Sequence, residues 1–84
     1  MNPAAVDPKL LNLLCRVLGK EHRPRISLET RMEDIENWDS LTFIDIVLAV
    51  EEEFGLKISP ELAQEMVSVE AIQKIIREKH PVST

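Results

Sequence analysis

The fold is decided by one stretch of the sequence, ENWDSLTFIDIVLAVEEEFG, which occupies residues 36–55. From Ser40 to Phe54 the apolar residues recur at the spacings of an amphipathic helix. Gly55 follows, and glycine is the residue that most often ends a helix. A strand is the alternative for Ile44–Val50, which is rich in β-branched residues, but this run does not alternate and three glutamates follow it directly. The stretch therefore predicts a helix from about Ser40 to Phe54.

This predicted helix has two apolar faces when its residues are placed at about 100° per residue. The first face is suited to a core and consists of Phe43, Ile46, Val47, Val50 and Phe54. The second face lies opposite; it combines an apolar strip (Leu41, Ile44 and Leu48) with an acidic rim (Asp45, Glu51 and Glu52). Two explanations of the second face remain open. A short third helix could cover it, or it could serve partner proteins or a tethered apolar chain.

The rest of the chain predicts three more helices, so that the expected fold is all-α with no repeat. They lie at about residues 8–18, 60–66 and 69–79, and the one at 60–66 is short. Their limits are marked by capping residues, glycine or proline. These markers are Asp7-Pro8, Gly19, Ser59-Pro60-Glu61, Ser68 and His80-Pro81. We expect residues 1–84 to form a single small domain with a frayed tail from about residue 80.

Residues 20–39 have neither a helical nor a strand period and are predicted to form a long loop. Loops of this length in compact domains are usually functional or held by their own apolar side chains. Four residues could hold this one: Ile26, Leu28, Met32 and Ile35. The basic cluster His22-Arg23-Arg25 could bind a ligand, but we interpret it as part of a solvated loop.

The charge of the chain is −5, which disfavours nucleic acids and anionic membranes and favours partners with positive patches. Between Met32 and Gly55 there is no Lys, Arg or His, and eight of the fifteen carboxylates lie there. Carboxylates this close repel one another, and docking of Arg or Lys would relieve the repulsion. Salt or divalent cations are expected to stabilise the domain for the same reason.

The number of cysteines and the hydropathy of the chain indicate in which cellular compartment we expect it. Cys15 is the single cysteine, so an internal disulfide is excluded, and we interpret it as a small semi-buried apolar side chain. The first residues lack a basic segment followed by an apolar run, and the run Leu41–Val50 is too short to span a bilayer. The expectation is a cytoplasmic monomer that does not insert into membranes.

Ser40 is poorly placed for catalysis. A nucleophilic serine needs a base and a group that orients the base, and only His22 and His80 are available, one in the loop and one near the end of the chain. No glycine flanks Ser40, and the sequence has no phosphate-binding loop and no metal-ligand spacing. As a modification site Ser40 is well placed, because a helix N-terminus favours an added negative charge. The alternative is that Ser40 or Asp39 simply caps the helix.

The segment from Glu36 to Gly55 resembles the acyl carrier protein family around its phosphopantetheine attachment site. The likeness rests on Asp39-Ser40-Leu41 followed by an apolar helix that ends in Glu51-Glu52-Glu53-Phe54, and it continues through Leu56-Lys57-Ile58-Ser59-Pro60. It covers nearly the whole chain.

The resemblance implies a four-helix bundle with a short third helix and a non-catalytic carrier role. By it, a phosphopantetheinyl transferase attaches 4'-phosphopantetheine from coenzyme A to Ser40, Asp39 positions that serine, and the arm carries acyl groups as thioesters. Partner enzymes with basic patches would dock against six residues: Leu41, Ile44, Asp45, Leu48, Glu51 and Glu52. All six residues belong to the second face of the predicted helix, which lies opposite the core face when residues are placed at about 100° per residue.

Three positions depart from the pattern of fatty-acid carriers. Asn37 stands where glycine is common, Thr42 where an acid is common, and Trp38 precedes the motif. The sequence looks more like a specialised stand-alone carrier than a housekeeping one, although Trp38 is interpreted chiefly as packing the loop against the bundle. Two alternatives stay open. The cargo could be an aminoacyl or peptidyl group, or the chain could be an unmodified acidic interaction module.

Overall fold

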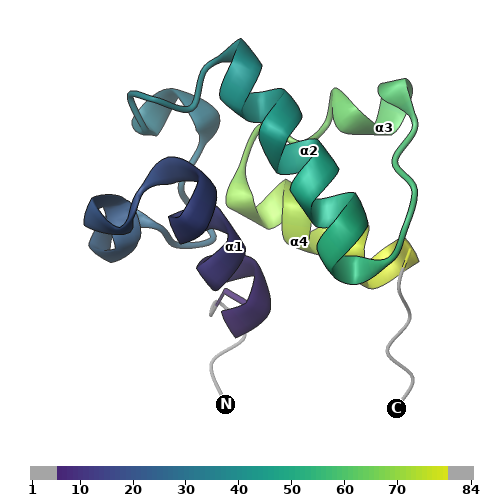
Figure 1. The fold of residues 1–84 in the computed structure, drawn as a ribbon, viewed down its shortest axis with the longest axis horizontal. Helices are drawn as coiled ribbons and strands as arrows, with labels where there is room; N and C mark the ends of the chain where they lie inside the picture. The colour runs from purple at the N-terminus through teal and green to yellow at the C-terminus, as the bar shows by residue number, and fades with distance from the viewer. Residues whose placement is uncertain (1–5, 80–84) are drawn as a thin grey trace.

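The computed structural model describes residues 6–79, and within them every regular element is helical (Figure 1). Four α-helices and two 3-10 helices follow one another along the chain: α1 (Pro8–Leu18), η1 (Lys20–Arg25), η2 (Met32–Asp34), α2 (Ser40–Phe54), α3 (Pro60–Ala63) and α4 (Val69–Lys79). The all-α fold with a short third helix is confirmed. The predicted stop at His80-Pro81 and the predicted frayed tail lie outside the described residues.

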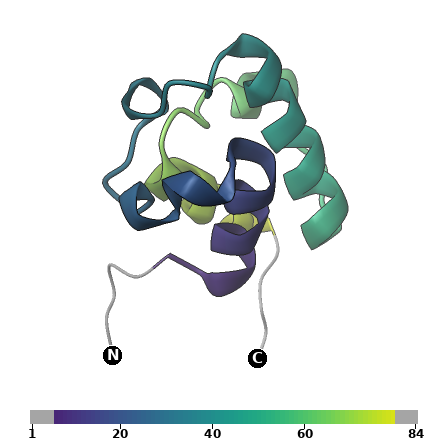
Figure 2. The ribbon, with the colours of Figure 1, turned by 60° about the vertical axis from the view of Figure 1, so that its left-hand side comes forward.

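The core is aliphatic and is shared by α1, α2 and α4 (Figures 1 and 2). α1 packs against α2. Each long helix contributes its apolar face: Leu10, Leu13, Leu14 and Leu18 from α1; Ile46, Val50 and Phe54 from α2; Val69, Ile72, Ile75 and Ile76 from α4. The predicted core face of α2 is confirmed, with Phe43 and Val47 only partly buried at its edge. Burial of such side chains, worth roughly 1.5–3 kcal/mol each, fixes the orientation of α2.

Both ends of α2 are set by local interactions. At its start the Asp39 carboxylate Oδ1 accepts a hydrogen bond from the Thr42 backbone N–H at 3.0 Å. At its end Gly55 adopts a left-handed conformation, with φ of 64°, and its N–H donates to the carbonyl of Glu51. A residue with a Cβ would be strained at this φ. The predicted limits of this helix are therefore confirmed.

The segment between α1 and α2 is more regular than the predicted loop, because it contains η1 and η2. Ile26 and Ile35 are buried as predicted, while Leu28 and Met32 are partly buried. The segment is also tied to the region before α4, since Met32 N–H donates to the carbonyl of Val67 and Val69 N–H donates to that of Thr30. The segment that leads to Ser40 is therefore held by its buried side chains and by two backbone hydrogen bonds to the region before α4.

The third helix ends earlier than predicted, at Ala63 instead of Met66. Beyond it the chain tightens, because the backbone N–H groups of Glu65 and Met66 donate to the carbonyls of Leu62 and Ala63, three residues back. Met66 is fully buried in the core. These three-residue hydrogen bonds replace the α-helical pattern after Ala63, and Met66 enters the core from this turn.

No helix of residues 6–79 combines the length and the apolar character needed to cross a membrane.

Candidate functional site

Ser40 is the first residue of α2 and is exposed (Figure 1, upper end of α2). Its hydroxyl makes no hydrogen bond to any residue in the range 6–79, and its position at the helix start places it next to the unpaired N–H groups of the first turn. A serine in this position presents its Oγ to solvent beside the positive end of the helix dipole.

The capping role belongs to Asp39, which settles the alternative that Ser40 is the cap. The Asp39 carboxylate accepts the hydrogen bond from Thr42. The backbone N–H and then the hydroxyl of Thr42 lower the pKa of Asp39 below its ordinary value, so that this carboxylate is ionised at neutral pH. Because Asp39 supplies the cap, the hydroxyl of Ser40 is left free.

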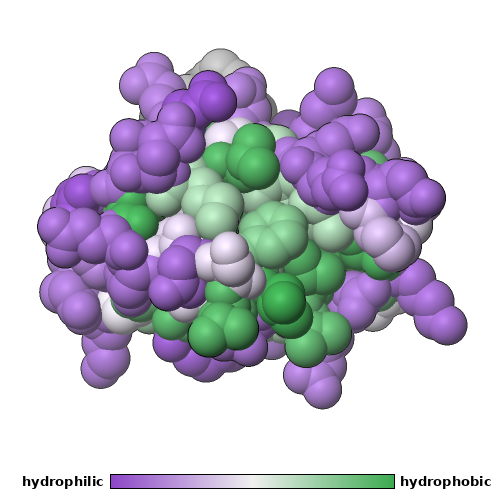
Figure 3. All heavy atoms as spheres, turned by 90° about the horizontal axis from the view of Figure 1, so that it is seen from above, coloured by the Kyte–Doolittle hydropathy of each residue, from purple (hydrophilic) through white to green (hydrophobic). Residues whose placement is uncertain are grey.

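The three residues of the apolar strip are exposed, which decides the question of whether α3 covers them. Leu41, Ile44 and Leu48 are 76%, 51% and 57% exposed. A fourth exposed hydrophobic residue, Val67 at 40%, lies in the segment before α4 and was not predicted. Figure 3 views the molecule from the end at which α2 begins, and apolar surface gathers in the middle of that face with polar surface around it. Apolar patches rimmed by polar residues are a common feature of interaction sites.

The acidic rim divides into free and engaged carboxylates. Asp45 and Glu52 make no ion pair or hydrogen bond with any described residue. Glu51 differs, because its Oε2 accepts a hydrogen bond from the Ile58 N–H at 2.7 Å. Two other carboxylates of residues 32–55 do form ion pairs: Glu53 with Arg16 of α1 and Glu33 with Arg31, both at 3.2 Å. Both arginines lie outside the stretch in which the sequence has no basic residue.

A shallow hollow at the C-terminal end of α2 brings strip and rim together. It is lined by Leu48, Glu51, Glu52, Leu56 and Lys57. Three of these five residues were predicted to contact partners. An apolar floor with a carboxylate edge fits a side chain that has an aliphatic stem and a cationic end, as Lys and Arg do.

Asn37 and Trp38, which precede the motif, each show a feature that the sequence did not reveal. The Asn37 amide Nδ2 donates to the carbonyl of Leu18 at 2.6 Å, which satisfies a free carbonyl at the end of α1. Trp38 is only 3% exposed, as its predicted packing role requires. Its Nε1, however, has no hydrogen-bond partner within the described part of the chain. An unpaired buried donor of this kind costs about 1–3 kcal/mol.

The basic cluster in η1 braces the loop. Arg23 reaches Asn12 Oδ1 at 3.4 Å and the sulfur of Cys15 at 3.7 Å, and Arg25 donates to the carbonyl of Asp34. Cys15 is buried, more fully than the predicted semi-buried state. Within residues 6–79 no group of three His, Cys, Asp or Glu side chains could hold a metal ion.

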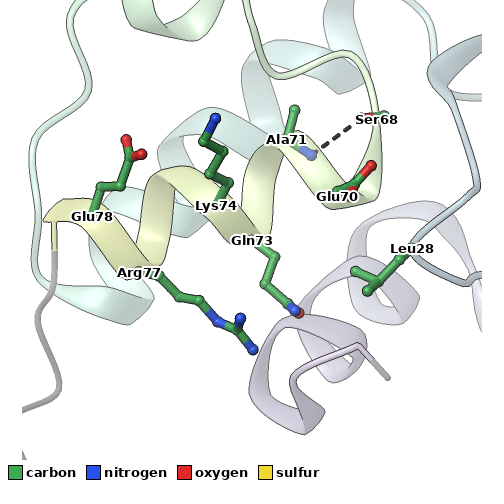
Figure 4. A pocket seen from close by; sticks show the side chains of 8 residues that line it. All are labelled: Leu28, Ser68, Glu70, Ala71, Gln73, Lys74, Arg77 and Glu78. Atoms are coloured by element: carbon green, nitrogen blue, oxygen red, sulfur yellow. Dashed lines mark hydrogen bonds between the residues drawn. The ribbon is translucent and has the colours of Figure 1, made fainter. Parts of the chain in front are cut away.

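A second hollow lies on α4 and contains none of the predicted site residues (Figure 4). It is lined by Leu28, Ser68, Glu70, Ala71, Gln73, Lys74, Arg77 and Glu78. Gln73 points toward the start of α1 in this view, and its Oε1 accepts a hydrogen bond from the Asp7 N–H at 2.7 Å. Gln73 therefore ties α4 to α1.

Comparison with known proteins gives the same assignment as the geometry. A family model described as a phosphopantetheine attachment site matches residues 8–76, a range that includes Ser40. The acyl carrier protein of Buchnera aphidicola subsp. Baizongia pistaciae (strain Bp) is 31% identical over 72 residues, which are 86% of this chain and 91% of the relative. That of Bdellovibrio bacteriovorus is 29% identical over 75 residues, 89% of this chain and 95% of the relative.

A chloroplastic acyl carrier protein of Brassica napus is 31% identical over 70 residues, which are 83% of this chain but only 52% of that longer relative. The family model thus matches the chain across α1, α2, α3 and most of α4. The chain belongs to the acyl carrier protein family, whose members hold 4'-phosphopantetheine covalently.

Proposed function

We propose that Ser40 is the attachment point of 4'-phosphopantetheine and that the chain carries acyl groups as thioesters on this arm. The observation that supports the proposal most strongly is the free, exposed hydroxyl of Ser40 at the start of α2. The adjacent Asp39 caps the helix without involving this hydroxyl. The chain itself catalyses no step. Enzymes of fatty-acid, polyketide or other specialised biosynthesis, acting in the cytoplasm, would load and process the cargo.

The residues present fit the phosphopantetheine group. Its attachment forms a bond between Ser40 Oγ and a phosphorus of coenzyme A, breaks the pyrophosphate linkage, and releases adenosine 3',5'-bisphosphate, while the serine proton passes to a base of the transferase. The new phosphodiester lies at the N-terminus of α2, where the helix dipole favours a negative charge by about 0.3–1 kcal/mol. When bound, the group supplies a thiol on a long arm.

Partner enzymes are proposed to dock on α2. The apolar strip (Leu41, Ile44 and Leu48) gives contact area, and the free carboxylates of Asp45 and Glu52 attract Arg and Lys. Glu51 belongs to the same surface, but its Oε2 already accepts the hydrogen bond from Ile58. The hollow beside Leu48 offers a partner two carboxylates, from Glu51 and Glu52, next to one cation of its own, Lys57.

The test is incubation of the purified chain with coenzyme A and a broad-specificity phosphopantetheinyl transferase, followed by mass spectrometry of the intact protein. The wild type should gain the mass of one phosphopantetheine, and Ser40→Ala should gain none. Ser59→Ala is the matched control, because Ser59 also begins a helix, and it should be modified like the wild type. No adduct on the wild type would contradict the carrier role and favour an unmodified interaction module.

A further inference from the structure

The 3-10 helix η1 lies on the surface and adds no side chain to the core. None of its residues is buried, and it packs against α1. Its two arginines contact neutral groups. Arg23 reaches Asn12 Oδ1 at 3.4 Å and the sulfur of Cys15 at 3.7 Å, and Arg25 donates to the carbonyl of Asp34. These contacts orient both guanidinium groups without neutralising their charge.

The cations of η1 have no carboxylate partner in the described part of the chain. Lys20, Arg23 and Arg25 are exposed, and none of them forms an ion pair with another of residues 6–79. Arg16 and Arg31 differ, because each pairs with a glutamate at 3.2 Å. A guanidinium has five N–H donors, so the contacts of the two η1 arginines leave donors free for a further acceptor.

Positive and negative charge lie on different sides of the molecule. Residues 6–31 hold six of the ten Lys and Arg residues and three carboxylates, whereas residues 32–55 hold eight carboxylates and no Lys or Arg. Both ribbon views place α1 between η1 and α2 (Figures 1 and 2). A partner on η1 would therefore leave the exposed strip of α2 open.

We propose that η1 is a docking site for an acidic segment of a partner protein, whose Asp and Glu carboxylates bind Lys20, Arg23 and Arg25. Guanidinium groups bind carboxylates through paired, charge-assisted hydrogen bonds. Because Arg23 and Arg25 are already held by their own contacts, binding orders them at a lower entropic cost than free arginines. The site is independent of the proposed attachment of an arm to Ser40.

The charge of the whole chain favours a short acidic segment over other anionic partners. At physiological ionic strength charges are screened over about 8 Å, so a short segment experiences chiefly the cations of η1. An extended polyanion, such as a nucleic acid or an anionic membrane, would also meet the net charge of −5. A second copy of this chain brings the same net charge with it. A local cluster of carboxylates on another protein fits best.

The test is a titration of the nitrogen-15-labelled chain with acetyl-pentaglutamate amide at an ionic strength of about 0.15 M. The largest shifts should fall on the backbone amides of η1 and on the side-chain N–H groups of Arg23 and Arg25. Arg23→Gln with Arg25→Gln should raise Kd roughly fivefold or more. Arg16→Gln with Arg31→Gln removes the same charge outside η1 and is the matched control, with an expected change below about twofold.

Lys20→Gln gives a second measurement that leaves the contacts of the arginines in place. The Lys20 side chain makes no hydrogen bond or ion pair with another of residues 6–79, so its replacement should preserve the fold. Its loss should raise Kd by about twofold. Backbone amide signals of α2 that match those of the wild type show that each variant is folded.

Two results would overturn the site. One is the absence of shifts in η1 up to about 10 mM peptide, and the other is an equal weakening in the η1 double variant and the control. Hexathymidylate tests the other class of partner, because its five phosphodiesters carry the same charge as pentaglutamate. Tighter binding of hexathymidylate than of the peptide would contradict an acidic protein segment as the partner.

Discussion

The two ends of α2 share one arrangement and use it differently. At the start Asp39 accepts a hydrogen bond from the backbone, and the adjacent Ser40 is free. Near the end Glu51 accepts a hydrogen bond from the Ile58 N–H, and the adjacent Glu52 is free. In each pair one side chain accepts a hydrogen bond from the backbone and its neighbour makes none within the described residues. The free neighbour is a hydroxyl at one end and a carboxylate at the other, and these are the groups that we propose for attachment of the arm and for docking.

The other helix starts show what happens without such a pair. Ser59 caps α3 through the hydrogen bond that its Oγ accepts from the Leu62 N–H at 3.2 Å. The Oγ of Ser68 accepts one from the Ala71 N–H at 3.1 Å at the start of α4. Both serines are therefore engaged, whereas Asp39 relieves Ser40 of this role.

The largest stability effect is expected from the pair at the end of α2. Glu51→Ala removes the acceptor of the Ile58 N–H and should lower the free energy of unfolding by about 1.5 kcal/mol. Glu52→Ala should change it by less than about 0.5 kcal/mol, because Glu52 makes no contact of this kind. Urea unfolding measures both. Glu51→Gln keeps an acceptor oxygen and serves as the control, and equal losses in Glu51→Ala and Glu52→Ala would break the comparison.

The next largest difference in unfolding free energy is expected between alanine substitutions of Ser59 and Ser40. Ser59→Ala removes a helix cap and should cost about 1 kcal/mol of unfolding free energy. Ser40→Ala should cost less than about 0.5 kcal/mol, because its hydroxyl has no partner in the described chain. Denaturant titrations of the two variants under the same conditions provide the measurement. A loss at Ser40 as large as that at Ser59 would show that Ser40 is structurally engaged.

A smaller difference is expected between two substitutions of Asp39. Asn is also a good cap, so Asp39→Asn should melt close to the wild type at neutral pH, whereas Asp39→Ala should melt lower. The two variants thus separate the cap from the charge. If Asp39→Ala melted like Asp39→Asn, the cap would contribute nothing.

The pH dependence of Asp39 follows from the direction of its pKa shift. The folded pKa is lowered by the hydrogen bonds from Thr42, so the unfolded chain binds the proton more tightly. The contribution to stability is complete above the unfolded pKa of about 3.9 and is lost as the pH falls through the lower folded pKa. Thermal melts from neutral pH into acid should show the melting temperature of the wild type falling by more than that of Asp39→Asn. Parallel curves for the two proteins would contradict the shift.

The smallest effect is expected from charge reversal of the free carboxylates, which should slow attachment of the arm without preventing it. Asp45→Lys with Glu52→Lys should lower kcat/KM for modification by roughly three- to tenfold, since exposed charges mainly affect the rate of encounter. The final yield of modified protein should not change. Raising the salt concentration should reduce the difference between this variant and the wild type. An unchanged kcat/KM at low salt would remove the docking role of these two carboxylates.

The limits of α2 could be predicted from the sequence because they depend on residues adjacent to it. Asp39 and Gly55 act within one turn of the helix ends. The end of α3 was predicted too late, at Met66 instead of Ala63. The spacing of Leu62, Ala63 and Met66 fits a continuing helix, whereas after Ala63 the chain forms a tighter turn that neither glycine nor proline marks.

The candidate site was predicted in part for the same reason. Helical periodicity places Leu41, Ile44 and Leu48 on the face opposite the core, but only the structure shows that α3 leaves them exposed. The bond from Asn37 to the carbonyl of Leu18 joins residues 19 apart, and the unpaired state of Trp38 Nε1 depends on everything packed around it. Val67 lies outside the helices, so that no period indicates its exposure.

The central claim is that the free hydroxyl of Ser40, released by the Asp39 cap, holds the arm. The most direct measurement is fragmentation mass spectrometry of the modified wild-type chain, which locates the phosphopantetheine on one residue. The account predicts that every fragment carrying the added mass contains Ser40 and that none carries it on the capping serines Ser59 and Ser68. Added mass on either capping serine, or on no serine at all, would contradict it.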